Sequence, residues 1–220
     1  LHASFTVGDD TVREAGVLCC DLGVPLHVHL AEDMADVWDA RKREYHGPLE
    51  RLLKLKTLPP GSILAHGVHL SRDQVHRCAD LGLWLVQNPR SNRGNAVGYP
   101  SALDESRRVA LGTDGYPADM RVETEALYAE ARSHGEADAA VGRRTTAGAG
   151  LVEQRFGLAF DPLADGAAAD AAVFTDTGVR HVVVGGRLVV KDGMLLTADV
   201  DTVRAEARGQ AAQLWARMGG

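Results

Sequence analysis

The chain has little cysteine, no excess of positive charge and no long hydrophobic run. Its 220 residues include three cysteines, Cys19, Cys20 and Cys78, and no two of them form a C-x-x-C pair. Such a sparse, odd set argues against a disulfide framework or a structural zinc knot, and it favours a reducing cytoplasm. The longest apolar runs, such as residues 182–184 and 188–190, are far shorter than the roughly 20 residues of a membrane-spanning helix. We therefore expect a cytoplasmic protein with no membrane partner.

The charge balance excludes a further class of partner. The chain carries 24 Lys and Arg against 30 Asp and Glu, a formal net charge of −6, and it has no basic run. No nucleic acid is therefore expected to bind. The hydrophobic share of 45% is enough for a sizeable core, which excludes a disordered chain. A small-molecule ligand is the class of partner that the composition leaves open.

What is present is an alternation of short apolar runs with amphipathic stretches. Helices are predicted from the end of the first apolar run to Arg43, and over residues 72–81 between Ser71 and Gly82. Strands that alternate with helices pair in parallel, so the fold class is α/β, either a (β/α)8 barrel or a doubly wound sheet. Both folds bind ligands at the carboxyl ends of their strands. The predicted strands are residues 24–30, 62–66, 83–86 and 108–111.

The C-terminal third changes character. Two-residue hairpin turns are predicted at Gly185-Gly186 and Asp192-Gly193, and a terminal helix is predicted over residues 201–218. The short strands around these turns predict a small antiparallel β unit. They are residues 169–174, 179–184, 187–190 and 194–196.

Polar residues follow the predicted parallel strands. His29 ends the first strand, on the same face as His27, and Glu32 comes just after it. His66 ends the second strand, and Asp114 follows the fourth between two glycines. Each residue alone has a structural explanation, since a strand histidine often packs in a core and an aspartate often forms a turn. Together they offer imidazole and carboxylate groups suited to a divalent metal and to proton transfer.

Four short motifs occur at or after the ends of the predicted strands: H-x-x-E at residues 29–32, A-H-G-V-H-L at 65–70, N-P-x-S-N at 88–92 and L-G-T-D-G at 111–115. In this order they resemble the amidohydrolase superfamily, and more narrowly its hydrolytic deaminases and chlorohydrolases. The likeness looks closest to aminohydrolases of the SsnA type. Residues 1–7 are similar to the fourth barrel strand of that branch, and residues 165–173 to the entry of its sandwich.

This resemblance implies a C-terminal part of a (β/α)8 TIM-type barrel, followed by a small antiparallel β-sandwich unit and a terminal helix. Residues 1–160 would form barrel strands four to eight, and residues 161–220 the sandwich segment and the helix. The family's H-x-H pair on the first barrel strand has no counterpart, because His27-Val28-His29 precedes Glu32 with the spacing of strand five. We therefore expect an N-terminal half, in the same polypeptide or in another chain, as a partner. The sequence is also compatible with a homo-oligomer.

The resemblance also implies roles at the site. His29 and Asp114 would bind one divalent metal ion, with zinc as the first choice and iron or manganese as alternatives. Asp114 would take a proton from the attacking water, and Glu32 would protonate a ring nitrogen. His66 would orient the water and stabilise negative charge.

The implied function is hydrolytic deamination of an amino-substituted nitrogen heterocycle, such as a purine, pyrimidine or triazine-like ring, by a metal-activated water. His2, Asn88 and Asn92 are expected to contact this substrate, although residues 88–92 are by composition first of all a turn. Two alternatives stay open. One is a dehalogenating or cyclic-amide hydrolase that uses the same site, and the other is a non-catalytic half that needs its N-terminal part.

Overall fold

The chain forms two compact units, Leu1–Gly157 and Leu158–Gly220. The structure, a computed structural model, describes residues 1–158, 164–167, 169–176 and 178–219. The predicted boundary between residues 160 and 161 lies outside the described residues, so the division into a partial barrel and a sandwich segment stays a prediction.

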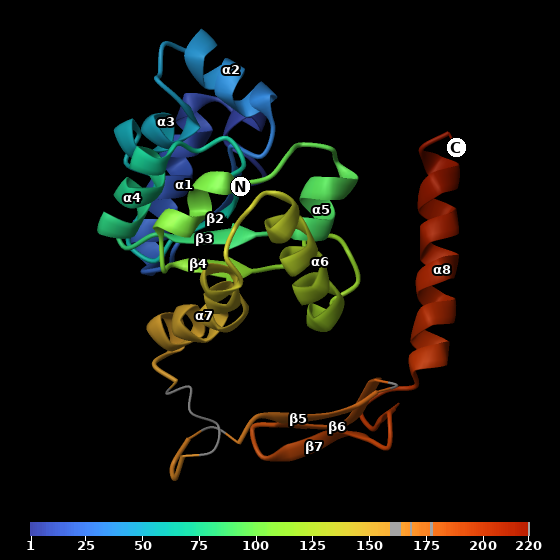
Figure 1. The fold of residues 1–220 in the computed structure, drawn as a ribbon. Coiled ribbons are helices and arrows are strands. Elements are labelled where there is room, and N and C mark those ends of the chain that lie inside the picture. Colours follow the sequence, from blue (N-terminus) through green and yellow to red (C-terminus); the bar gives the residue numbers. More distant parts are fainter. Residues whose placement is uncertain (159–163, 168, 177, 220) are drawn as a thin grey trace. The chain divides into compact units, whose positions relative to one another are not determined.

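The first unit is built on a parallel sheet, which confirms the predicted α/β class. Its four strands follow the order β1-β2-β3-β4, so each strand pairs with the next one along the chain (Figure 1). Leu30 pairs with His66, and Gln87 pairs with Leu111, so the carboxyl ends of the strands lie level. Three strands are shorter than the predicted ones, and the third has the predicted length but is shifted by one residue: β1 is His27–Leu30, β2 Ile63–His66, β3 Trp84–Gln87 and β4 Val109–Leu111.

The first residues of the chain lie along the free edge of β1. Ala3 forms a parallel bridge with His29, whose amide donates to the His2 carbonyl at 2.9 Å. The chain then turns into a short 3-10 helix, Ser4–Thr6. The strand expected in this segment, barrel strand four, is therefore reduced to a single bridge.

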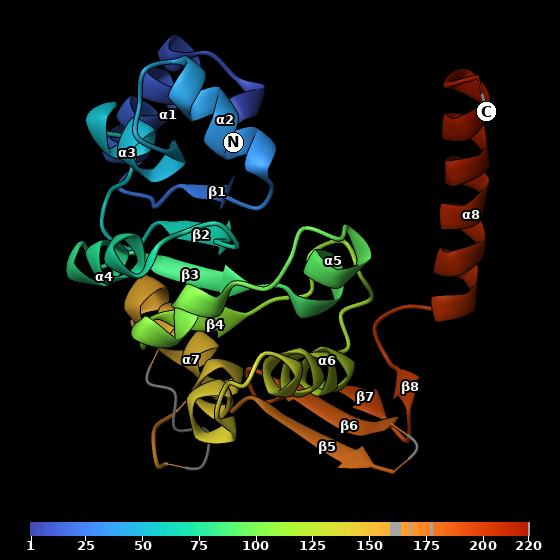
Figure 2. The same cartoon turned by 45° about the horizontal axis from the view of Figure 1, so that its top comes forward.

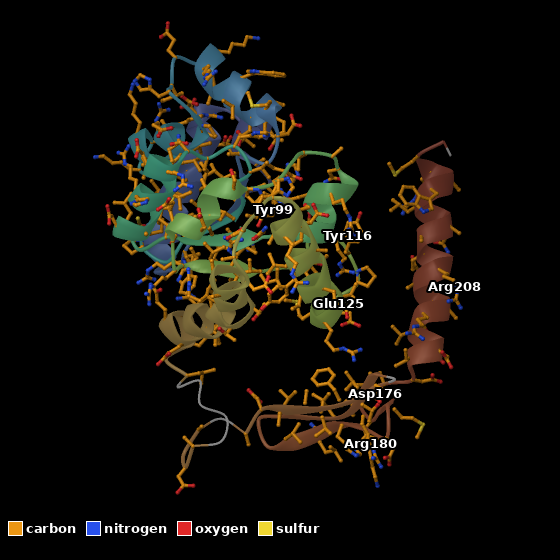
Figure 3. The ribbon with its side chains drawn as sticks, in the orientation of Figure 1. Tyr99, Tyr116, Glu125, Asp176, Arg180 and Arg208 are labelled. Carbon is orange, nitrogen blue, oxygen red and sulfur yellow. The ribbon has the colours of Figure 1, made fainter. Side chains whose placement is uncertain are left out.

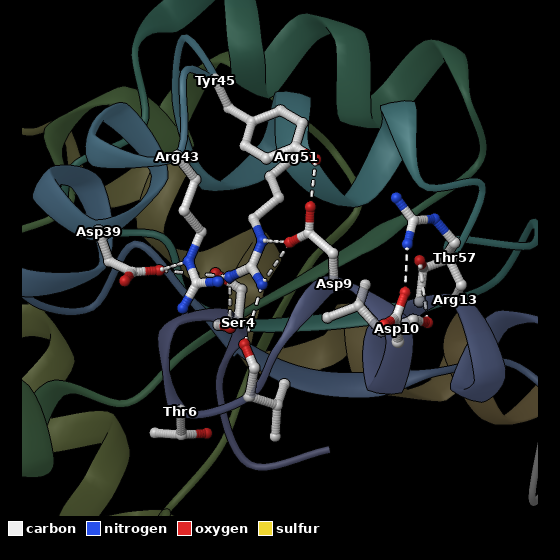
Figure 4. A network of polar contacts seen from close by, with 12 residues as sticks. Ser4, Thr6, Asp9, Asp10, Arg13, Asp39, Arg43, Tyr45, Arg51 and Thr57 are labelled. Atoms are coloured by element: carbon white, nitrogen blue, oxygen red, sulfur yellow. Dashed lines mark hydrogen bonds and ion pairs between the residues drawn. The ribbon is translucent and has the colours of Figure 1, made fainter.

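A buried arginine accounts for this early turn. The Arg51 side chain is fully buried, and its guanidinium donates to the carbonyls of Ser4 at 2.5 Å and Val7 at 2.9 Å. It also pairs with Asp9 at 2.8 Å, and Tyr45 donates to the same carboxylate (Figure 4). These hydrogen bonds tie the start of the chain to the helix that carries Arg51.

Helices follow each strand of this sheet, as the alternation predicted (Figure 2). The predicted helix at residues 72–81 is confirmed as α4, which ends one residue earlier. Its Ser71 cap accepts from the Gln74 amide, and Gly82 follows it at a φ of +69°. The helices are α1 Asp9–Leu22, α2 Met34–Lys42, α3 Pro48–Lys54, α4 Arg72–Asp80, α5 Pro89–Gly94, α6 Met120–Ser133 and α7 Asp138–Phe156, with a 3-10 helix at Ser101–Glu105.

The prediction of a turn at residues 88–92 is wrong. Asn88 is the residue before helix α5, and Pro89 takes the first helical position. Proline is well tolerated there because its missing N–H would have no intrahelical acceptor, and its fixed φ suits a helix. Asn92 donates its amide to the Asn88 carbonyl at 2.9 Å, so the N-P-x-S-N motif forms one helical turn.

The second unit contains an antiparallel sheet, which confirms the predicted hairpins. Gly185 and Gly186 both have positive φ, as do Asp192 and Gly193, which is the geometry of two-residue hairpin turns. The described strands form one sheet, and no described residue of this unit is fully buried. Its elements are β5 Ala171–Thr175, β6 Gly178–Val184, β7 Arg187–Lys191, β8 Met194–Leu195 and α8 Val200–Arg217. No helix in the described part of the chain combines the length and apolar character that a bilayer span requires.

Candidate active site

The carboxyl ends of the parallel strands bring the predicted residues together. His29 lies in β1, His66 ends β2, and Glu32 follows β1 by two residues. One potential ligand atom from each lies within 4.8 Å of the others. The Glu32 Oε2 atom is 3.5 Å from the Nε2 atom of the fully buried His66. The structure thus places imidazole and carboxylate groups in one cluster, from segments that are more than thirty residues apart in sequence.

Asp114 lies near the same Nε2 atom of His66. Its Oδ2 atom is 3.8 Å from His66 Nε2 and accepts a hydrogen bond from Ser91 Oγ at 2.5 Å. Partial burial alone would raise the pKa of Asp114. The hydrogen bonds from the Ser91 side chain and from the Gly115 backbone oppose this effect, and the pKa of Asp114 lies below its usual range. Asp114 is therefore ionised at neutral pH.

The backbone at the site is strained. Ala31, His66 and Asp114 have φ values of +48°, +76° and +51°, in the left-handed region that residues with a Cβ rarely adopt. Each such residue costs on the order of 1–3 kcal/mol and persists only where the surrounding contacts enforce it. These three positions all follow or end a parallel strand, so the strain is concentrated where the polar side chains meet.

His29 packs between two other imidazoles. Its ring makes edge contacts with His66 at 5.1 Å and His2 at 4.9 Å between centroids. Burial, followed by the nearby His66, lowers the pKa of His29, which favours the neutral imidazole that ligates metals. Among the described residues no group hydrogen-bonds to its buried Nδ1 atom.

This donor set fits a divalent metal ion. Imidazole and carboxylate ligands suit zinc, iron and manganese, and a buried Nδ1 atom without a protein partner belongs to a side chain whose donors are not all used by the fold. The sequence pointed to His29 and Asp114 as ligands. The geometry adds Glu32 and His66 as groups near enough to contribute.

Helix α5 supplies polar contacts that the sequence did not predict. Asn95 Nδ2 donates to Glu32 Oε1 at 3.1 Å, and Ser91 holds Asp114 as described above. The two substrate-binding candidates on this helix both lie beside His66. Asn92 Oδ1 is 2.8 Å from His66 Nδ1, and Asn88 Nδ2 is 3.5 Å from Nε2. Composition could have drawn attention to this polar segment, because all three asparagines of the chain fall within residues 88–95.

A buried carboxylate that the sequence did not single out supports the strained turn after β1. Asp36 Oδ2 accepts from the Ala31 amide at 2.8 Å, and its other oxygen accepts from the Ser4 hydroxyl. Burial is the largest influence on Asp36 and raises its pKa, although both hydrogen bonds oppose this. Asp36 therefore fixes the backbone between His29 and Glu32.

A cavity of about 350 Å³ opens beside Asp114. Tyr116, labelled in Figure 3, forms part of its wall. The Tyr116 hydroxyl packs against Gly94 of α5. Arg90 lies over the Tyr116 ring and pairs with the fully buried Glu123, which joins α5 to α6. The cavity is lined by Ser91, Asn95, Asp114, Gly115, Tyr116 and Pro117.

Comparisons with known proteins agree with this arrangement. The model of the amidohydrolase family matches residues 1–189, so the chain belongs to the amidohydrolase family. A 5-methylthioadenosine/S-adenosylhomocysteine deaminase of Natronomonas pharaonis is 29% identical over 249 residues, covering 100% of this chain and 58% of the relative. A 5'-deoxyadenosine deaminase of Methanopyrus kandleri is 26% identical, covering 97% of this chain and 57% of the relative. The chain thus spans little more than half the length of these curated relatives.

Solved structures share the fold. An adenosine deaminase from Xanthomonas campestris, crystallised with zinc, aligns with a TM-score of 0.83 at 23% identity, over 98% of this chain and 56% of its own. The zinc complex of the atrazine chlorohydrolase TrzN from Arthrobacter aurescens aligns with a TM-score of 0.70 at 20% identity, over 92% and 52%. At these identities the likeness concerns the fold.

Proposed function

We propose that this chain carries the acid–base half of a metal-dependent hydrolase that deaminates an amino-substituted nitrogen heterocycle. The observation that supports it most is that Glu32 Oε2 and Asp114 Oδ2 both lie near His66 Nε2, at 3.5 and 3.8 Å. Hydrolytic deamination needs one group that takes a proton from water and another that gives a proton to the ring. Two carboxylates around one imidazole at the strand ends supply both.

The proposed roles follow from the surroundings of each group. Asp114, ionised and held by Ser91, accepts a proton from the attacking water. Glu32 donates a proton to the ring nitrogen next to the carbon under attack. His66 orients the water and stabilises the negative charge that develops on its oxygen. The new C–O bond forms, and Asp114 passes the proton that it took from water to the amine. The C–N bond then breaks and ammonia leaves, while the hydroxyl proton of the intermediate returns to Glu32 as the C=O bond forms.

A divalent metal, when bound, lowers the pKa of a coordinated water so that hydroxide is available near neutral pH. His29 and Asp114 are its proposed ligands in this chain, with zinc ahead of iron or manganese. A metal site usually needs at least three protein ligands. We therefore propose that the remaining ligands come from an N-terminal half, in the same polypeptide or in another chain. The functional protein would then be a cytoplasmic enzyme, whose oligomeric state the proposal leaves free.

The substrate class is proposed from the relatives. Two deaminases that align with nearly the whole of this chain are named after adenosine derivatives modified at the 5' position. A 6-aminopurine presents the required geometry, an exocyclic amine beside a basic ring nitrogen. We propose that His2, whose ring contacts His29 at the site, faces this substrate.

The test uses the full-length protein loaded with zinc. Adenosine, 5'-methylthioadenosine, S-adenosylhomocysteine, cytosine and atrazine are supplied separately, and released ammonia and chloride are measured with and without a chelator. The expected result is release of ammonia from at least one aminopurine, abolished by the chelator and restored by zinc. Release of chloride alone would favour the dehalogenating alternative, and a protein that holds no metal would favour the non-catalytic one.

A further inference from the structure

The orientation of the His66 ring is set by two asparagines. The ring is fully buried, Nδ1 lies 2.8 Å from Asn92 Oδ1, and Nε2 lies 3.5 Å from Asn88 Nδ2. A carboxamide oxygen can only accept a hydrogen bond, so the Nδ1 atom must carry a proton. A carboxamide nitrogen can only donate, so Nε2 must offer its lone pair. Both contacts therefore require the same neutral tautomer.

We propose that Asn92 is a positioning residue that keeps the Nδ1 atom of His66 protonated and leaves an unprotonated Nε2 atom at the position near Glu32 and Asp114. This role replaces the expected contact of Asn92 with substrate. It rests on the proposed function only for its kinetic consequence, because the tautomer is a property of the protein without metal or substrate.

Two neighbours of Asn92 form hydrogen bonds with the two carboxylates beside His66. Ser91 and Asn95 lie one helical turn apart, and they donate to Asp114 at 2.5 Å and to Glu32 at 3.1 Å. Asn92 lies between them in sequence and faces His66. One short helix thus contacts all three groups proposed to move protons. Its orientation is fixed in turn by the Arg90–Glu123 pair.

The tautomer limits what His66 can do. An unprotonated Nε2 atom can accept a hydrogen bond from the attacking water, in place of the long 3.5 Å contact from Asn88 Nδ2, and so orients the water. The same atom can donate to the developing negative charge only after it has gained a proton. Asn92 also remains hydrogen-bonded to Nδ1 in the protonated ring, because both nitrogens then carry protons.

The direct test is the tautomer of His66 in the metal-free, substrate-free protein. Long-range ¹⁵N–¹H spectra of the full-length protein are recorded at roughly pH 8, above the ordinary histidine pKa. The His66→Asn variant identifies the His66 signals among those of the other histidines. We expect the shifts of a protonated Nδ1 and an unprotonated Nε2. A protonated Nε2 with a free Nδ1 would overturn the proposal without any bearing on whether the protein is a deaminase.

Two substitutions of similar size separate positioning from substrate contact. Asn92→Asp keeps an acceptor for Nδ1, and Asn92→Leu removes it. We expect the Nδ1-protonated form to persist in Asn92→Asp and to be lost in Asn92→Leu, with kcat of the latter reduced about 10- to 100-fold and KM nearly unchanged. The exposed neighbour on the same helix, Arg93→Leu, is the control and should leave both the spectrum and kcat as they are.

The opposite pattern would contradict the proposal. If Asn92 contacts substrate, KM should rise in both variants while the His66 shifts stay those of the parent. Should Asn92→Leu fail to fold, the spectra of the parent and of Asn92→Asp decide the question alone, since loss of Nδ1 protonation in either is incompatible with the proposed role.

Discussion

The two ends of the parallel sheet differ in chemistry although the same four strands build them. At the carboxyl end, His29, His66 and Asp114 meet on strained backbone, with polar contacts from helix α5. At the amino end, a cavity of about 370 Å³ is lined mainly by apolar side chains. Its wall includes Cys19, Cys20, Pro25, Pro59, Ile63, Trp84 and Leu151.

The difference shows how a parallel sheet separates two tasks. Carboxyl ends present loops that can vary without disturbing strand pairing, so residues there serve chemistry, whereas the amino ends serve stability. Ser62 illustrates the second task. It is fully buried at the start of β2, where its hydroxyl accepts from the Leu26 amide at 3.1 Å and donates to the Pro59 carbonyl at 2.7 Å. Substitutions at the two ends should therefore affect different measurements.

The largest effect is expected for Glu32→Gln. This change keeps the shape of the side chain but removes the proton that Glu32 is proposed to donate, so turnover should fall by about 10²- to 10⁴-fold with metal content retained. The rate is measured as ammonia release and the metal by elemental analysis. Glu153→Gln, an exposed residue beside the amino end, is the matched control and should keep full turnover. A Glu32→Gln enzyme within about threefold of the parent would show that Glu32 is a polar turn residue, because a lost proton donor costs far more.

A second pair of changes separates metal binding from charge stabilisation within the carboxyl end. Asp114→Asn should weaken metal binding as well as turnover, because the carboxylate is proposed to serve both. His66→Asn should keep the metal and lose on the order of 10²- to 10³-fold in turnover, the usual cost of removing a preorganised donor. Metal stoichiometry is measured beside the rate. If His66→Asn loses the metal as completely as Asp114→Asn, His66 is a ligand and the single-metal proposal must give way to a two-metal site.

Much of the carboxyl end could be predicted from the sequence, because strand ends and motif residues are local features. The apolar runs predicted β1 to β4. The polar residues at or just after the ends of these strands are His29, Glu32, His66 and Asp114. The contacts between them depend on strand order and register, which no local pattern contains. The bond from Asn95 to Glu32 joins residues 63 positions apart, so it could not be anticipated.

Helix propensity explains why other elements were missed. Helix α7 contains Gly142, Gly148 and Gly150 beside two threonines, residues that favour helices poorly. It forms because it packs along β4, where Gly150 lies against the Trp84 ring. Packing of this kind is visible only in the folded chain.

A smaller effect, confined to stability, is expected for Ser62→Ala at the amino end. The change leaves the buried Leu26 amide without its acceptor, which should lower the free energy of unfolding by about 1–3 kcal/mol. Turnover per folded molecule should not change. Urea denaturation gives the first quantity, and Ser101→Ala, an exposed site, is the control. A loss of turnover with unchanged stability would break the division between the two ends.

The smallest effect is expected for modification of Cys20, the exposed thiol at the amino end. Burial raises the pKa of the Cys78 thiol from 9.0 to about 12, so this group stays protonated and unreactive in the folded protein. In the unfolded chain the Cys78 thiol ionises near pH 9.0, whereas in the folded chain it stays protonated up to about 12. The contribution of Cys78 to the free energy of unfolding is therefore complete below pH 9.0 and is lost as the pH rises through about 12.

Treatment of the native protein with a maleimide at roughly pH 8, below that window, should therefore label one thiol quickly, and Cys20→Ser should remove it. Cys19 and Cys78 should react only after unfolding, since both are buried. Because Cys20 lies at the end of the sheet that serves stability, labelling it should leave turnover unchanged. A second thiol that reacts quickly in the native state, or a labelled enzyme that loses its activity, would show that the amino end is open or coupled to the site.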